Sequence, residues 1–107
     1  MNSIAALADP TRQRIVEMLA QAPMSSGEIA RRFAVSPPAV SQHLKALKAA
    51  RLVLVHPRKQ QRIYALNPEG VAELAQWVDR IRAFWNPKLD ALEAALASSG
   101  EAAGQKK

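Results

Sequence analysis

Hydrophobic residues recur every three or four positions along much of the chain, which is the spacing that puts side chains on one face of an α-helix. The first clear helix start is Asp9-Pro10, because an aspartate can accept from a free backbone N–H and proline suits the first helical position. The apolar stripe of this helix consists of Ile15, Met18 and Leu19. A shorter helix is expected before it, around residues 3–7.

A second helix start lies at Ser25. Ser25 and Glu28 have the spacing of a capping box, in which each side chain accepts from the backbone N–H of the other residue. Met24 and Ile29 are spaced as a hydrophobic staple across the same start. The pattern therefore predicts a short helix that ends near Phe33.

The next predicted helix, over residues 36–50, has two different faces. Ser36 is its expected N-cap, and Pro37 and Pro38 occupy first-turn positions whose N–H groups would lack a helical partner anyway. The buried face is expected to consist of Val40, Leu44 and Leu47. The opposite face is polar, small and basic. Two helices in this order are typical of a helix-turn-helix motif, although helical hairpins without function can look similar.

The helical periodicity ends after Arg51. Residues 52–56 and 62–66 are predicted strands, and residues 57–61 are a turn with a basic tip. A hairpin attached to a helix-turn-helix is a wing. The expected fold is therefore mainly α with a small β-hairpin wing, a winged helix-turn-helix.

The last helical region is expected to begin at Asn67-Pro68. Its apolar stripe consists of Val71, Leu74, Val78 and Ile81, and is continued by Leu89, Leu92 and Leu96. Pro87 should kink or restart the helix, because a proline in a helix interior removes a backbone hydrogen bond.

This region carries more apolar surface than the closure of a small core needs, since Trp77, Phe84 and Trp85 add large aromatic area. The surplus predicts a homodimer. A long helix packed wholly within its own subunit is the alternative. Residues 1–97 are expected to form one domain, and residues 98–107 a disordered tail.

Charge is distributed unevenly along the chain. The formal net charge is +6, and no acidic residue lies between Glu28 and Glu69. The eight bases in that window are Arg31, Arg32, Lys45, Lys48, Arg51, Arg58, Lys59 and Arg62. Such a block is typical of a nucleic-acid surface. A merely solvated basic face is the weaker alternative, because ordinary surfaces intersperse both signs.

The composition excludes several kinds of site. The chain has no cysteine, which removes disulfides, thiolate metal sites and thiol nucleophiles. His43 and His56 stand in no recognisable constellation with a serine and an acid, and no glycine-rich phosphate loop exists, so neither an enzyme nor a cofactor is expected. The chain also lacks a run of about 20 apolar residues and a signal-peptide pattern, so we expect a cytoplasmic protein with no membrane partner.

Four motifs together resemble the ArsR/SmtB family of winged-helix repressors over about residues 4–96. They are, in order, Ala6-Leu7-Ala8-Asp9-Pro10-Thr11-Arg12, Gly27-Glu28-Ile29-Ala30, Ser36 through Leu47 with Val40-Ser41-Gln42-His43-Leu44, and Arg62-Ile63-Tyr64-Ala65-Leu66. The resemblance implies a homodimeric bacterial transcription regulator, with one DNA-binding and dimerisation domain over residues 1–97. Its partner would be double-stranded DNA with a palindromic operator, recognised by the helix over residues 36–50.

Candidate DNA-binding residues follow from the polar face, the basic window and the family pattern. They are Ser36, Pro37, Pro38, Ser41, Gln42, His43, Lys45, Lys48, Arg58, Lys59 and Arg62. Pro37 and Pro38 stand where polar residues are common in relatives, so they would read shape or a thymine methyl group. His43 flanks the buried stripe, and a supporting or phosphate-contacting role is as good an interpretation as base reading. The resemblance places dimer contacts on the first and last helices, at Ile4, Leu7, Trp77, Ile81, Phe84, Trp85, Leu89 and Leu92.

Many proteins that this sequence resembles sense metal or arsenic. The Cys-x-Cys of arsenic sensors would fall near Ser25 and Gly27, which cannot bind a thiophilic ion. The last helix has no histidine for the zinc site that relatives build across the dimer. We therefore expect no metal site. The alternative function is a winged-helix module that binds a protein or an RNA, because fold does not fix function.

Overall fold

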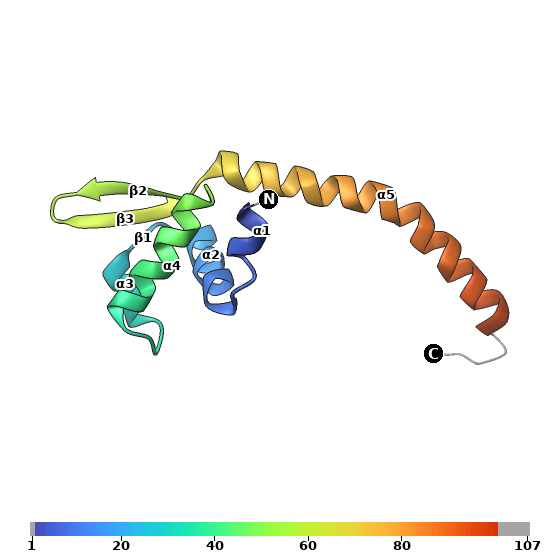
Figure 1. The fold of residues 1–107 in the computed structure, drawn as a ribbon, viewed down its shortest axis with the longest axis horizontal. Coiled ribbons are helices and arrows are strands. Elements are labelled where there is room, and N and C mark those ends of the chain that lie inside the picture. Colours follow the sequence, from blue (N-terminus) through green and yellow to red (C-terminus); the bar gives the residue numbers. More distant parts are fainter. Residues whose placement is uncertain (1, 101–107) are drawn as a thin grey trace. The chain divides into compact units, whose positions relative to one another are not determined.

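The computed structural model describes residues 2–100 of the 107-residue chain. These residues form five helices and one three-stranded sheet (Figure 1). The elements in chain order are α1 (Asn2–Ala6), α2 (Pro10–Gln21), β1 (Met24–Ser25), α3 (Ser26–Arg31), α4 (Pro37–Ala49), β2 (Val53–Arg58), β3 (Gln61–Leu66) and α5 (Pro68–Gly100). They divide between Leu74 and Ala75 into two compact units, and the first contains every element up to the start of α5.

Side-chain caps begin α2, α3 and α4 at the predicted residues. Asp9 Oδ2 accepts from the Arg12 backbone N–H at 3.0 Å, and Ser36 Oγ accepts from the Ala39 N–H at 3.3 Å. Pro10 and Pro37 then occupy the first helical positions of α2 and α4. Because a proline in the first turn gives up no helical hydrogen bond, both starts are fixed without loss.

The capping box at α3 is confirmed. Ser25 Oγ accepts from the Glu28 N–H at 3.1 Å, and Glu28 Oε1 accepts from the Ser25 N–H at 3.0 Å. The hydrogen bond from the Ser25 backbone lowers the pKa of the Glu28 carboxyl below its ordinary value, because that bond favours the ionised form.

The sheet is antiparallel with strand order β1-β3-β2, so β3 lies in its centre. The register pairs Met24 with Tyr64 between β1 and β3, and pairs Val53 with Leu66 and Arg58 with Gln61 between β2 and β3. The hairpin of β2 and β3, hereafter the wing, was predicted. Strand β1 was not, because two residues are too short to show an alternating pattern.

The turn of the wing is shorter than predicted. Residues 57–61 were expected to form it, whereas β2 runs through Pro57 to Arg58 and only Lys59 and Gln60 connect the strands. Pro57 is tolerated because β2 is an edge strand, on which a residue can lack an N–H without breaking the ladder. Lys59 has a φ of 59°, in the left-handed region that tight hairpin turns require.

One apolar core holds the first unit together. Its buried members are Ala6, Ile15, Leu19, Met24, Ile29, Val40, Leu44, Leu47, Leu52 and Val53. The predicted stripe of α4 is entirely inside, since Val40, Leu44 and Leu47 are at most 1% exposed. The opposite face of α4 is therefore directed away from the core.

Helix α5 is one continuous helix through Pro87 (Figure 1), so the expected restart at this residue is wrong. Proline lacks the N–H that would bond to the carbonyl of Ala83, but the absence of one bond does not end a helix of 33 residues. The helix continues to Gly100, past the start of the tail predicted over residues 98–107, and the remainder of that tail lies outside the described residues. In the described part of the chain, no helix is long and apolar enough to cross a membrane.

Candidate nucleic-acid interface

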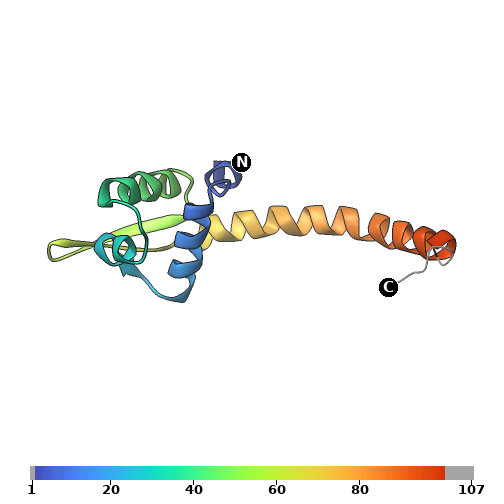
Figure 2. The same ribbon diagram turned by 90° about the horizontal axis from the view of Figure 1, so that it is seen from below.

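The outward face of α4 carries most of the candidate base-reading residues. Figure 2 shows α4 along one edge of the first unit. The exposed side chains are those of Ser36, Pro37, Pro38, Ser41, Gln42, Lys45 and Lys48. The buried stripe fixes this face by helical geometry, because residues about 180° from Val40 and Leu44 must point outward. Helical geometry places Pro38, Gln42 and Lys45 opposite the buried stripe and Ser41 beside them.

An open cleft lies between α4 and the wing. It is lined by Ser26, Ser41, Leu44, Lys45, Lys48, Arg62 and Tyr64. Three cations therefore meet at one groove, two from α4 and one from β3. Among the described residues, none of these three forms an ion pair with an acid. Such a groove concentrates positive potential where a phosphate backbone can enter.

Ser26 and Tyr64 were not identified from the sequence. Their place in the cleft depends on β1, whose residue Met24 pairs with Tyr64 on β3 and brings the start of α3 beside the wing. The serine directly after a capping serine was the available local signal. The pairing of β1 with β3 is what places Ser26 in the cleft, and this pairing could not be predicted from the neighbouring residues.

The tip of the wing carries Arg58 and Lys59, both exposed, beside Gln60 and Gln61. Arg58 ends β2, and Lys59 begins the two-residue turn. These side chains lie at the far end of the hairpin from α4, whereas Arg62 lines the cleft. The basic window thus supplies two surfaces, the cleft and the wing tip.

His43 does not share the outward face of α4. Its ring is half-buried, and its Nδ1 accepts from Arg12 Nε at 3.2 Å and lies 3.6 Å from Asp9 Oδ2. Both partners belong to the start of α2, so the ring connects α4 to α2. Of the two roles left open for His43, this contact favours the supporting one.

The candidate dimer residues fall in both units. Ile4 is 39% exposed and Leu7 is half-buried in the first unit. In the second unit, Trp77 is half-buried, and the exposed members are Ile81, Phe84, Trp85, Leu89 and Leu92. Phe84 and Trp85 meet edge to face with ring centroids 6.2 Å apart, and Lys88 Nζ lies 3.8 Å above the Phe84 ring. Helix α5 thus exposes a large apolar stripe of the kind that marks an interaction surface.

Within residues 2–100, no three of the histidine, aspartate and glutamate side chains gather into a group that could hold a metal ion. Insensitivity to metal stays a prediction.

Residues 9–54 match the model of the bacterial regulatory protein, arsR family. Over 96 residues the chain is 49% identical to the HTH-type transcriptional regulator Rv2034 of Mycobacterium tuberculosis, an alignment that covers 90% of this chain and 87% of the relative. The chain belongs to the arsR family. A second relative of this arsR-family protein is the transcriptional repressor SdpR of Bacillus subtilis, 35% identical over 77 residues, which are 72% of this chain and 86% of SdpR.

Solved structures agree with this family assignment. The crystal structure of a possible transcriptional regulator for arsenical resistance superposes with a TM-score of 0.73 and 35% identity, and covers 89% of this chain and 96% of its own. The homodimeric winged helix-turn-helix DNA-binding domain of Mb0332 from Mycobacterium bovis superposes with a TM-score of 0.64 and 28% identity, and covers 77% of this chain and 76% of its own. The predicted family and winged helix-turn-helix fold are confirmed, and the two curated relatives are named as transcriptional regulators, not as enzymes.

Proposed function

We propose that this arsR-family protein is a homodimeric transcriptional repressor that binds a palindromic operator in double-stranded DNA and senses no metal. The observation that carries the proposal is the cleft of Lys45, Lys48 and Arg62 directly beside the exposed polar face of α4. The relative SdpR is named a transcriptional repressor, which supports repression as the outcome of binding. This role takes place in the cytoplasm, as the sequence predicts.

In this proposal α4 is the recognition helix and lies in the major groove. Gln42 is the longest uncharged side chain on its exposed face and can form two hydrogen bonds with the edge of an adenine. Pro37 and Pro38 hold the start of the helix rigid and meet the groove by shape or by contact with a thymine methyl group. Pro37 and Pro38 thus set how the helix enters the groove, and Gln42 contacts the bases.

The cations have the other role. Lys45, Lys48 and Arg62 would neutralise phosphates along the cleft, and Arg58 and Lys59 would meet phosphates or the minor groove at the wing tip. Such contacts position the protein and add affinity that depends strongly on salt, but they carry little sequence information.

The dimer is supported by the exposed apolar stripe of α5, in which Phe84 is 59% and Leu92 is 54% exposed. A two-fold dimer presents two recognition helices and therefore matches a palindrome. The structural neighbour Mb0332 is described as homodimeric, which agrees with this assignment. Deletion of residues 87–107 should weaken self-association and operator affinity together, as measured by analytical ultracentrifugation and DNA titration. A truncated chain that stays dimeric at micromolar concentration would exclude this part of α5 as the main dimer contact.

The decisive experiment compares Gln42→Ala with Arg58→Ala on two duplexes. The operator is first selected from genomic fragments, and binding is then followed by fluorescence anisotropy at several salt concentrations. Gln42→Ala should cost about 1–3 kcal/mol on the operator and almost nothing on a scrambled duplex. Arg58→Ala should weaken both duplexes alike and reduce the salt slope by roughly one for each phosphate that the variant no longer neutralises.

Two outcomes would count against the proposal. Equal losses on operator and scrambled DNA for Gln42→Ala would remove base reading from this face of α4. Unchanged DNA binding for the wing variants Arg58→Ala and Lys59→Ala would favour the alternative, a winged helix that binds a protein or an RNA.

A further inference from the structure

The segment between α4 and β2 contains an unusual arginine. Arg51 has a φ of 64°, in the left-handed region that favours glycine. Its N–H bonds to the Lys48 carbonyl at 2.9 Å, and the Leu52 N–H bonds to the Leu47 carbonyl at 3.0 Å. These two bonds form a Schellman motif, in which glycine is the usual residue at the position of Arg51. A side chain at this position costs backbone energy that glycine would not.

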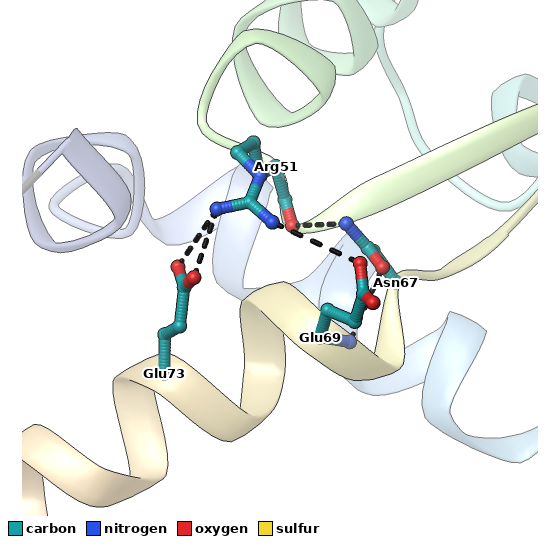
Figure 3. Close-up of polar contacts among 4 residues, drawn as sticks. All are labelled: Arg51, Asn67, Glu69 and Glu73. Carbon is teal, nitrogen blue, oxygen red and sulfur yellow. Dashed lines mark hydrogen bonds and ion pairs between the residues drawn. The ribbon is translucent and has the colours of Figure 1, made fainter.

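The Arg51 side chain is bound by acids on the first turns of α5 (Figure 3). Its Nη1 donates to Glu73 Oε1 at 3.0 Å and to Glu73 Oε2 at 2.9 Å, and its Nη2 lies 3.9 Å from Glu69 Oε1. These are the only ion pairs of Arg51 among residues 2–100. The guanidinium is therefore committed to α5, unlike the three cations that line the cleft.

The backbone of Arg51 is held as well. Its carbonyl accepts from Asn67 Nδ2 at 2.9 Å, and Asn67 is only 8% exposed. The Asn67 N–H in turn bonds to the Leu52 carbonyl at 2.9 Å, and Asn67 Oδ1 accepts from the Glu69 N–H at 3.2 Å. One asparagine thus caps α5 and binds the end of α4 at the same time.

Gly70 completes the contact. A Cβ at this position would overlap the Arg51 carbonyl oxygen and lie 2.7 Å from the carbonyl carbon, so only glycine allows the two backbones to approach this closely. We call the set of Arg51, Asn67, Glu69, Gly70 and Glu73 the α4–α5 junction.

We propose that Arg51 is a positioning residue, which holds the end of the recognition helix on the first turns of the helix that carries the dimer contact. This inference rests on the proposed function, because it concerns how two recognition helices engage one operator. Arg51 itself contacts no DNA in this scheme. If the junction loosens, a smaller fraction of dimers holds both recognition helices ready for the operator, and the apparent dissociation constant rises in inverse proportion to that fraction.

Glu73→Gln is the sharpest test, because electrostatics and positioning predict opposite results. Loss of one acid raises the formal net charge from +6 to +7, which by electrostatics alone leaves DNA binding unchanged or tighter. Positioning predicts weaker operator binding, by up to about threefold, since one exposed ion pair is removed in each of two subunits. Glu17→Gln is the matched control, because it removes the same charge from an exposed position on α2.

A second variant separates positioning from stability. Arg51→Gly removes the guanidinium but relieves the left-handed backbone, so its melting temperature should not fall below that of the wild type. Its affinity for the full operator should fall more than its affinity for a duplex with a single half-site, since one recognition helix needs no alignment with a second.

The outcomes are distinct. A selective loss on the full operator for Glu73→Gln and Arg51→Gly, with Glu17→Gln unchanged, supports the proposal. The proposal is overturned if Glu73→Gln binds the operator as tightly as Glu17→Gln does, or more tightly. Equal losses on operator and half-site also overturn it, because they indicate a merely structural role. If wild-type protein does not prefer the operator over scrambled DNA, the proposed function itself fails before the variants are compared.

Discussion

Replacement of Gly70 by alanine sets helix propensity against backbone packing. Gly70 lies in the first turn of α5, where alanine is favoured over glycine by up to about 1 kcal/mol. On this ground alone, Gly70→Ala should stabilise the protein. The structure predicts the opposite, because the new methyl group would overlap the Arg51 carbonyl, which is backbone and cannot rotate away.

The magnitude follows from what must move. To reach ordinary contact, the first turn of α5 has to shift away from the end of α4, which breaks the hydrogen bond from Asn67 Nδ2 to the Arg51 carbonyl. Loss of a hydrogen bond to a buried side chain costs about 1–3 kcal/mol, and residual overpacking adds a similar amount. The exposed ion pair with Glu73 contributes at most a few tenths of a kcal/mol after solvent screening. Against a gain of about 1 kcal/mol from propensity, the net loss should be about 3 kcal/mol at the middle of these ranges.

Urea and thermal unfolding at one fixed protein concentration would measure this loss, because the stability of a dimer depends on concentration. A loss of about 3 kcal/mol corresponds to a fall in melting temperature of roughly 10–25 °C for a unit of this size. Gly27→Ala is the control. The nearest atom to a Cβ at Gly27 is the flexible end of Arg31 at 3.6 Å, so this change should be neutral or stabilising. If Gly70→Ala is as stable as Gly27→Ala, the close approach in the junction is refuted.

Three further predictions test the caps and the metal response. Glu28→Gln should reduce the loss of stability on acidification. The pKa of Glu28 is lower in the folded than in the unfolded protein, so its carboxylate stabilises the fold at pH values above the unfolded pKa. This contribution is lost as pH falls through the folded pKa. Urea midpoints of the two proteins should therefore converge as pH falls below the ordinary glutamate pKa and through the lower folded pKa, and a difference that stays constant across that whole range would contradict the assignment. Asp9→Ala should cost about 1 kcal/mol in urea unfolding through loss of the α2 cap, whereas Asp9→Asn, which keeps an acceptor, should cost much less. Zinc and arsenite should leave operator binding unchanged, because the chain has no cysteine; zinc release of the operator that a chelator reverses would show otherwise.

Features with a local cause could be predicted from the sequence. The caps at Asp9, Ser25 and Ser36 were each found from two or three neighbouring residues, and all three are present in the structure. The stripe of α4 was equally accessible, because helical geometry alone decides which of its residues share a face. The exposed face of α4 follows from that stripe without further information.

Features that join distant segments could not be predicted in this way. Strand β1 is defined only by its pairing with β3, and the ring of His43 turns towards α2 because Arg12 and Asp9 lie there. Of the two effects expected at Pro87, a kink or a restart, the restart is wrong, because the loss of one hydrogen bond does not end a helix of 33 residues.

The charge pattern illustrates the same limit for function. The acid-free window between Glu28 and Glu69 holds eight bases, and its sequence does not say which of them are paired with acids from outside it. The acids that bound the window are near in space to particular bases, however, and Glu69 and Glu73 neutralise Arg51 at the α4–α5 junction. Lys45 and Lys48 lie on the same helix that Arg51 follows, but they line the cleft and form no ion pair among the described residues. A cation already paired with a carboxylate releases fewer counterions on meeting a phosphate, so the salt dependence of DNA binding should be set by the cleft and the wing tip rather than by the whole basic window. Sequence locates the basic block, and the placement of Glu69 and Glu73 outside it distinguishes the paired Arg51 from the cations, unpaired within residues 2–100, that we propose to meet DNA.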